Sequence, residues 1–177
     1  PKPSAGIGVV VGSEWANLSG AAPVNITVRN CTVGGPTWAD AFAIGLQGWS
    51  IQGIRVENCA FLSDRTGIQV GPGAGATIVG NTITGALDAG IAVVGPANTI
   101  DIRDNHVTMA MGANIQPTGL RLVGQMYKAP DGSFPPDPVT NTEVTGNVFD
   151  GEMTYGIRLS VATGNDINQN DLVGPKS

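Results

Sequence analysis

The sequence predicts an all-β solenoid, in which short strands wind into about six stacked coils. Three observations support this prediction. A six-residue phrase occurs six times, a shorter phrase precedes each copy, and apolar residues alternate with polar ones inside both. Alternation is typical of strands, because successive side chains of a strand point to opposite faces. No stretch of the chain has the apolar spacing of an amphipathic helix, so little helix is expected.

The longer phrase reads V-R-N-C-T-V in its first copy, and its fourth position is always Cys or Asn. Its copies occupy residues 28–33, 56–61, 78–83, 102–107, 144–149 and 167–172. Their fourth residues are Cys31, Cys59, Asn81, Asn105, Asn147 and Asn170. Asn tolerates the left-handed backbone of a sharp bend, and its amide can bond to the copies above and below. We therefore expect a ladder of stacked side chains at one corner of the coil.

The two cysteines occupy neighbouring positions of this ladder, so their side chains should stack. Stacked parallel side chains hold the Cβ atoms slightly too far apart for a disulfide, which favours two buried thiols over a bond. No metal site is expected, because the single histidine, His106, belongs to another coil. No cofactor is expected either.

The shorter phrase has the pattern small-aliphatic-any-aliphatic. Its copies occupy residues 6–9, 43–46, 67–70, 90–93, 119–122 and 156–159. Each coil should therefore hold two or three strands of three to five residues, separated by Gly, Asn and Pro-rich bends. One coil cannot bury its apolar face alone, so neighbouring coils stack at about 4.8 Å. Longer loops are expected at residues 13–23 and 125–139 of a single domain that spans residues 1–177.

Together the V-x-N-N-x-F-like and G-I-x-V-like phrases resemble the right-handed parallel β-helix of the pectin-lyase-like superfamily. The resemblance covers all six coils, and it implies a polysaccharide lyase, a glycosidase or a phage tailspike. The N-T-D, G-x-D-D, G-H-G and R-I-K signatures of polygalacturonases are absent, as is an Asp cluster like the calcium site of pectate lyases. The sequence therefore leaves open whether the protein is an enzyme.

Composition excludes two classes of function. The net charge is −5 and the nine Lys and Arg residues are scattered, whereas a nucleic-acid-binding protein needs clustered cations. The longest apolar run is far shorter than a bilayer span, so no membrane insertion is expected. The first and last coils start and stop abruptly without polar caps, which predicts a fragment of a longer chain.

A carboxylate recurs just before the shorter phrase, as Asp40, Asp64 and Asp88. Stacked coils would hold neighbouring carboxyls about 5 Å apart and the outer two about 10 Å apart. These separations bracket those of retaining and inverting glycosidases, which makes the three residues catalytic candidates. Asp64, flanked on both sides, would have the most raised pKa and act as general acid. The alternative is structural, because Asp often caps turns.

The outward position of the shorter phrase is expected to form one column across the coils. From first coil to last it reads Gly8, Gly45, Gln69, Ala92, Arg121 and Arg158. Two guanidinium groups about 5 Å apart repel each other, so an anion should lie near them. A uronate or a sulfated sugar would serve, and so would Glu143, Glu152 or Asp166.

We predict that Gln69 and Arg158 bind substrate. Arg121 is a catalytic candidate, since the resemblance implies a role like that of the proton-abstracting arginine of pectate lyases. Trp49, in the bend after the second strand, and Tyr127, in the long loop, are expected to stack on sugar rings. Alternatively, these aromatic residues seal the loops or contact a neighbouring subunit.

The sequence thus predicts an extracellular protein, secreted or virion-associated, that binds an acidic or neutral polysaccharide along the Gly-Ile strands. It would process that polysaccharide as a lyase, hydrolase or epimerase. The alternative is a non-catalytic attachment or structural module, such as a tailspike, virion fibre or adhesin, with a homotrimeric parent protein.

Overall fold

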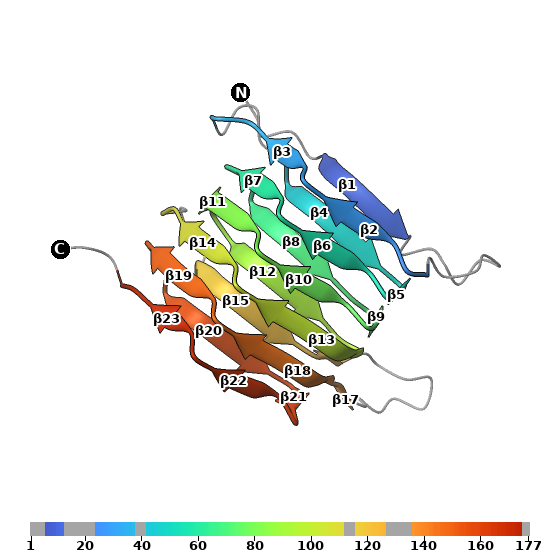
Figure 1. The fold of residues 1–177 in the computed structure, drawn as a ribbon. Helices are drawn as coiled ribbons and strands as arrows, with labels where there is room; N and C mark the ends of the chain where they lie inside the picture. Colours follow the sequence, from blue (N-terminus) through green and yellow to red (C-terminus); the bar gives the residue numbers. More distant parts are fainter. Residues whose placement is uncertain (1–5, 13–23, 38–41, 112–115, 127–135, 175–177) are drawn as a thin grey trace.

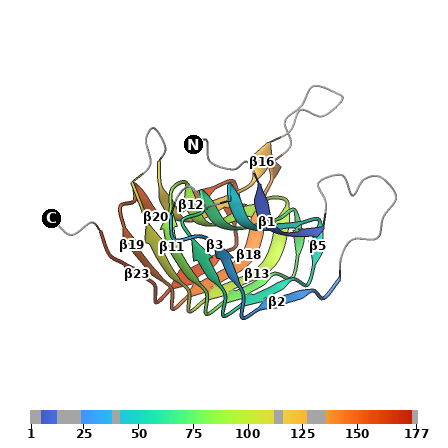
Figure 2. The ribbon, with the colours of Figure 1, turned by 90° about the horizontal axis from the view of Figure 1, so that it is seen from above.

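The computed structural model describes residues 6–12, 24–37, 42–111, 116–126 and 136–174. These residues form strands and turns without any helix, and the strands wind into six coils (Figure 1). Seen from above, the coils lie one behind another around a shared interior (Figure 2). Each coil contributes one strand or more to each of three parallel sheets, which confirms the predicted all-β solenoid.

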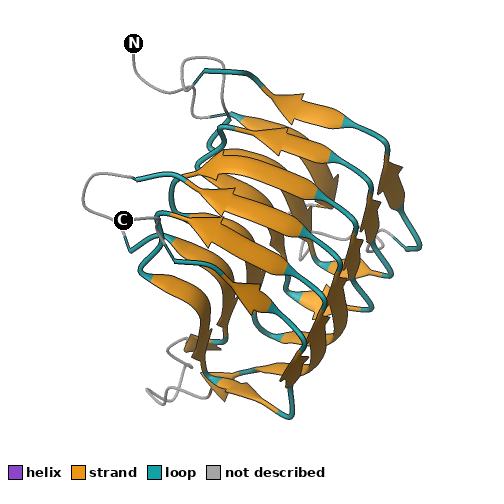
Figure 3. Ribbon diagram, turned by 60° about the vertical axis from the view of Figure 1, so that its left-hand side comes forward, coloured by secondary structure: helices purple, strands orange, loops and turns teal. Residues whose placement is uncertain are grey.

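We call the three sheets A, B and C in the order in which each coil visits them (Figure 3). Sheet A contains β1 (Ile7–Gly12), β4 (Ile44–Trp49), β8 (Thr66–Val70), β12 (Ala89–Val94), β15 (Thr118–Val123) and β20 (Tyr155–Ser160). Sheet B contains β2 (Thr27–Arg29), β5 (Ile51–Gln52), β6 (Arg55–Glu57), β9 (Gly73–Ala74), β10 (Thr77–Val79), β13 (Ala97–Arg103), β18 (Val139–Thr145), β21 (Ala162–Thr163) and β22 (Asp166–Asn168). Sheet C contains β3 (Thr32–Gly34), β7 (Ala60–Leu62), β11 (Thr82–Ala86), β14 (His106–Met109), β19 (Val148–Gly151) and β23 (Asp171–Leu172).

The predicted Asn ladder lies inside the corner between sheets B and C. The Oδ1 atom of Asn105 accepts hydrogen bonds from the backbone N–H and the side-chain amide of Asn81, both at 2.9 Å. Asn147 accepts the same pair of bonds from Asn105, and Asn170 accepts them from Asn147. The amides of Asn81, Asn105 and Asn147 are buried, and each bonds to a backbone carbonyl of the preceding coil. The ladder therefore fixes the register of the coils.

Left-handed residues directly precede this ladder and turn the chain from sheet B into sheet C. They are Asn30, Asn58, Gly80, Asp104, Gly146 and Gln169, with φ between 52° and 65°. Gly, Asn and Asp tolerate this conformation best, which explains why the longer phrase is rich in them. Gly80 and Gly146 have a second reason to be glycine. A Cβ at either position would lie 2.7 Å from the side-chain oxygen of Asn58 or Asp104, respectively.

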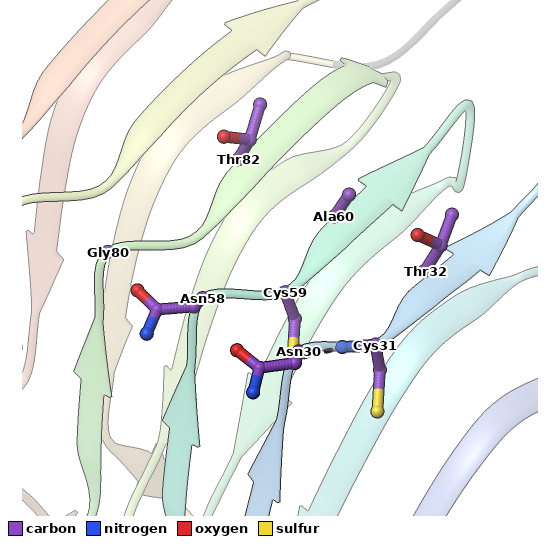
Figure 4. Close-up of a pocket in the computed structure, with 8 residues that line it drawn as sticks. All are labelled: Asn30, Cys31, Thr32, Asn58, Cys59, Ala60, Gly80 and Thr82. Atoms are coloured by element: carbon purple, nitrogen blue, oxygen red, sulfur yellow. Dashed lines mark hydrogen bonds between the residues drawn. The ribbon is translucent and has the colours of Figure 1, made fainter.

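The ladder continues into the first coils through sulfur, as predicted. The backbone N–H of Cys59 donates to Asn81 Oδ1 at 3.0 Å, and that of Cys31 approaches Cys59 Sγ at 3.5 Å (Figure 4). Both cysteines are free thiols. Burial is the main cause that raises the pKa of the Cys59 thiol, so it stays protonated at neutral pH.

Cys59→Asn should complete the ladder and raise the free energy of unfolding by about 1 kcal/mol. An amide at this position would replace a weak N–H···S contact with a conventional bond to Cys31, and would reach Val28 O, which Cys59 Sγ approaches at 3.8 Å. Urea denaturation at neutral pH measures the change. Cys59→Ala is the matched control and should be destabilising. A loss of stability in Cys59→Asn as large as that in Cys59→Ala would contradict the expectation.

The interior is filled by apolar side chains that stack in columns. Phe61, Ile83, Val107 and Phe149 of sheet C are each at most 1% exposed, and they lie at equivalent positions of successive coils. Opposite them, the start of sheet A is lined by glycines, which leave room for these side chains. The column consists of Gly8, Gly45, Gly67, Gly90, Gly119 and Gly156. Core side chains thus pack directly against bare backbone.

This glycine column corrects the predicted alignment of the shorter phrase. Ile44 pairs with Thr66 and Leu46 with Ile68, so the first two copies are displaced by two residues from the others. The equivalent segments are 8–11 in the first coil and 45–48 in the second. Gly8 and Gly45 therefore belong to the inner column rather than to the outward column in which the sequence analysis placed them.

Within the predicted loop at residues 125–139, β16 (Gln125–Met126) pairs antiparallel with β17 (Pro136–Asp137), and the chain rejoins sheet B at Val139. Residues 127–135 lie outside the described residues. The other predicted loop, residues 13–23, lies outside the described residues. Among the described residues, no helix is long and apolar enough to span a membrane.

Candidate functional site: the outer face of sheet A

The outer face of sheet A carries a column of six side chains, four of which are polar, and it is the candidate site. In register, the column reads Val10, Gln47, Gln69, Ala92, Arg121 and Arg158. Gln47 was missed because of the displaced alignment. Two amides therefore lie next to each other in the second and third coils, and two guanidinium groups in the fifth and sixth. Successive positions of the column are about 4.8 Å apart, and the buried Ala92 separates the two amides from the two guanidinium groups.

Arg121 pairs with a carboxylate of the neighbouring coil. Its Nη1 and Nη2 atoms each lie 3.3 Å from one carboxylate oxygen of Asp88, in a two-pronged arrangement. Both side chains are partly exposed. The prediction that Glu143, Glu152 or Asp166 pairs with the arginines is therefore wrong for Arg121. Its partner is Asp88, in the turn before β12. A guanidinium group presents donors in a planar fork, so Arg121 is suited to binding an anion.

Arg158 is exposed and contacts only neutral groups of the described residues. Its Nη1 atom donates to Gln116 Oε1 at 3.2 Å, and its guanidinium carbon lies 5.4 Å from the centre of the Tyr155 ring. Such a cation–π contact orients the guanidinium group without neutralising its charge. Arg158 is thus a positive charge beside the Arg121–Asp88 pair, and Tyr155 places an aromatic ring next to it. The sequence analysis did not single out Tyr155 or Gln116.

Trp49 is the last residue of β4, and not part of the following bend as predicted. It is partly exposed and lies two residues after Gln47, on the same face. Its neighbours in the adjacent coils are Gly12 and Gly71, neither of which has a side chain. Among the described residues, the indole is therefore the only side chain at this strand position of the three coils. An aromatic ring on a polar outer face is a common feature of sugar-binding sites.

Asp64 does not belong to this face, which corrects the expected column of three carboxylates. Asp64 lies two residues before Thr66, whereas Asp88 lies one residue before Ala89, the register partner of Thr66. This offset of one residue turns the two side chains to opposite sides of the chain. Asp64 points inward and is 1% exposed, whereas Asp88 points outward to Arg121. A buried carboxyl cannot protonate a substrate bound on the outer face.

The remaining predicted site residues, Asp40 and Tyr127, lie outside the described residues. Within the described residues, no group of three or more His, Cys, Asp or Glu side chains is arranged to hold a metal ion.

A separate feature, which the sequence analysis missed, is an open groove at the corner between sheets B and C (Figure 4). The side chains of Asn30 and Asn58 form one wall, and Thr32, Ala60 and Thr82 form the other. None of the described residues that line it is charged. Gly80, which occupies the position of Asn30 and Asn58 in the third coil, also lines the groove.

The sheets, the ladder and the polar outer column together define a parallel β-helix solenoid. The chain belongs to the right-handed β-helix family, whose model, described as "Right handed beta helix region", matches residues 6–126. Comparison with curated proteins and with solved structures gave no significant match. Assignment to the pectin-lyase-like superfamily stays a prediction.

Proposed function

We propose that the outer face of sheet A binds an extended polysaccharide, with the sugar chain lying along the solenoid axis. The observation that carries the proposal is the register pairing of Arg121 with Arg158 on adjacent strands. Of the two, Arg158 has no acidic partner among the described residues. Two cations and one carboxylate leave a net positive patch on a protein whose net charge is −5. An anionic group of a ligand would neutralise that patch.

The other groups of the column suit the uncharged part of such a ligand. Gln47 and Gln69 present amides that can donate to and accept from sugar hydroxyls. Trp49 and Tyr155 supply aromatic surface at the second and sixth coils. The spacing of about 4.8 Å per coil is close to the length of one sugar unit, so successive units can meet successive coils. The positive patch formed by Arg121 and Arg158 favours an acidic polysaccharide over a neutral one.

Arg158→Gln should weaken binding of polygalacturonate oligosaccharides about tenfold at low ionic strength. Loss of one charge-assisted contact costs about 1.5 kcal/mol, which corresponds to roughly a tenfold change in Kd. Isothermal titration calorimetry measures the change. Raising the salt concentration should weaken wild-type binding, because the contact is partly exposed.

Arg103→Gln is the matched control, because it removes the same charge from the outer face of sheet B, where Arg103 pairs with Asp101 at 3.3 Å. It should change Kd less than twofold. An equal loss in both variants would show that net charge and not the sheet A site controls binding. Unchanged binding in Arg158→Gln would contradict the proposed site.

Glycan processing is a second step of the proposal, and it needs its own assay. Asp64 is buried and Asp88 is paired with Arg121, so the described residues support binding better than general acid catalysis. Incubation with the bound polysaccharide, followed by measurement of new reducing ends and unsaturated products, separates an enzyme from an attachment module. Product that disappears in Asp88→Asn would support processing, whereas tight binding without product would support attachment.

A further inference from the structure

Asp64 is a buried acid that the proposed binding site does not use. It lies in the turn between β7 and β8, at the corner between sheets C and A. Its Oδ1 atom accepts a hydrogen bond from the backbone N–H of Phe42 at 2.9 Å. Its Oδ2 atom is also buried and has no hydrogen-bond partner. A carboxyl group buried in this way is expensive to ionise, because one oxygen has lost water without gaining a donor.

The surrounding backbone is shaped around this carboxyl. Gly45 and Gly34 lie against it, so that a Cβ at Gly45 would overlap Oδ2 and a Cβ at Gly34 would lie 3.1 Å from Oδ1. The carboxyl thus fills a small space between the first two coils. Hydration of Oδ2 would require these backbone segments to move apart.

Among the residues that the structure describes, no charged side chain offsets the burial of Asp64. The elements packed against it are β3, β4, β7 and β8, and none of their residues is titratable. Arg65 is next in the chain but is exposed, and Asp40 lies outside the described residues. Burial raises the pKa of Asp64 to about 6, and the Phe42 N–H only partly opposes this rise. The neutral form of the carboxyl is therefore favoured by the lack of water around it.

Phe42 connects this site to the first coil. Its ring would lie 3.2 Å from a Cβ at Gly6 or at Gly8, so it packs directly on the start of β1. The neighbouring Ala43 N–H donates to Gly6 O at 2.9 Å. Movement of Phe42 away from Asp64 would therefore loosen β1.

We propose that Asp64 is a proton-controlled latch, in which the neutral carboxyl holds Phe42 and β1 in place and the ionised carboxyl releases them. Ionisation makes Oδ1 a stronger acceptor for the Phe42 N–H but leaves the charge on Oδ2 without a donor. Water must then reach Oδ2, and its entry opens the contact with Gly45 and loosens the segment that begins at Phe42. The release is local, because the ladder from Asn81 onward lies in later coils and contains no titratable group. This inference does not depend on glycan binding.

The direction of the pH dependence follows from the raised pKa. The closed state binds the proton more tightly than the open state, whose carboxyl has its ordinary pKa near 4. The latch is therefore strongest below about pH 4, weakens as the pH rises towards about 6, and stays weak above it. A displacement of about two pH units corresponds to roughly a 100-fold change in the opening equilibrium.

Hydrogen exchange of backbone amides between pH 4 and pH 7.5, corrected for the intrinsic exchange rate, tests the latch. The protection of the Phe42 and β1 amides should fall roughly 100-fold over this range, while that of Val107 in β14 should not change. In Asp64→Asn, which keeps an oxygen acceptor but cannot ionise, protection should be independent of pH. Asp88→Asn, which alters an outward carboxylate, is the matched control and should behave like the wild type.

Two results would overturn the latch: Phe42 protection that is constant with pH in the wild type, or the same fall in Asp64→Asn. A carbon NMR titration of the wild-type Asp64 carboxyl avoids any folding defect of the variant. A midpoint near 6 supports the proposal, and a midpoint near 4 overturns it.

Discussion

Asn105→Ala is expected to lower the free energy of unfolding by about 4 kcal/mol, enough to leave the protein only marginally stable. The Asn105 amide accepts two hydrogen bonds from Asn81 and donates to Ile78 O and to Asn147 Oδ1, each at 2.9 Å. Alanine would leave these buried groups without partners. A buried donor or acceptor without a partner costs about 1–3 kcal/mol, so the losses together are large. Urea unfolding followed by far-ultraviolet circular dichroism measures the change.

Asn98→Ala is the control for this prediction, because it changes the same residue type in the same coil. Asn98 is exposed and donates to Thr140 Oγ1 at 3.0 Å. Its loss should cost less than about 0.5 kcal/mol, as is usual at the surface. If Asn105→Ala were as mild as Asn98→Ala, the ladder would not be a main source of stability.

Gly90→Val should destabilise the protein by at least about 3 kcal/mol, or prevent it from folding. A Cβ at Gly90 would overlap Val107 Cγ1 and lie 2.8 Å from the backbone oxygen of Gly119. Val107 is fully buried, and the Gly119 backbone is held in sheet A by its pairing. Neither neighbour can move without separating two coils. Soluble yield and thermal unfolding measure the effect.

Two further variants identify the cause. Gly174→Ala places a Cβ where nothing lies within 4 Å, so it should have no effect. Gly90→Ala with Val107→Ala removes the overlap with Cγ1 but keeps the close approach to Gly119 O. The loss of stability in this double variant should therefore be smaller than the effect of Gly90→Ala alone would predict. Full stability of Gly90→Val would show that sheets A and C do not meet at this point.

The sequence predicted the ladder and the solenoid, with two or three strands in each coil, because both depend on a repeated pattern. A buried Asn at a left-handed corner leaves a distinct mark, since few residues tolerate that backbone and fewer can bond in both directions. Cys59 could be placed in the same column because the residues around it match the repeated phrase, although Cys itself differs chemically from Asn. The alternation inside each phrase indicated strands and not helices, as the structure shows.

The register of sheet A was predicted wrongly for the first two coils, and the reason is physical. The aliphatic residues of the phrase repeat every two residues, so a displacement by two still leaves a small residue followed by an aliphatic one. The segment from Gly6 contains two small-aliphatic pairs in succession, and both fit the phrase. Spacing to the ladder would have decided between them. Gly45 precedes Cys59 by 14 residues, as Gly67 precedes Asn81 and Gly156 precedes Asn170.

The carboxylates could not be placed because they lie in turns. A turn can gain or lose one residue without disturbing the strands, and one residue reverses the direction of a side chain. Asp64 and Asp88 differ in this way, so one became a buried acid and the other the partner of Arg121. A raised pKa was predicted for Asp64, but its cause is burial and not the neighbouring carboxylates.

The claim on which this account rests is that equivalent residues of successive coils bond to one another. Scalar coupling across hydrogen bonds, measured by NMR on a uniformly labelled sample, tests it directly. The account predicts coupling from the backbone nitrogen of Asn81 to the side-chain carbonyl carbon of Asn105, and from that of Asn105 to Asn147. Coupling of these nitrogens to carbonyls within their own coil, with no contact between the three side chains, would contradict it.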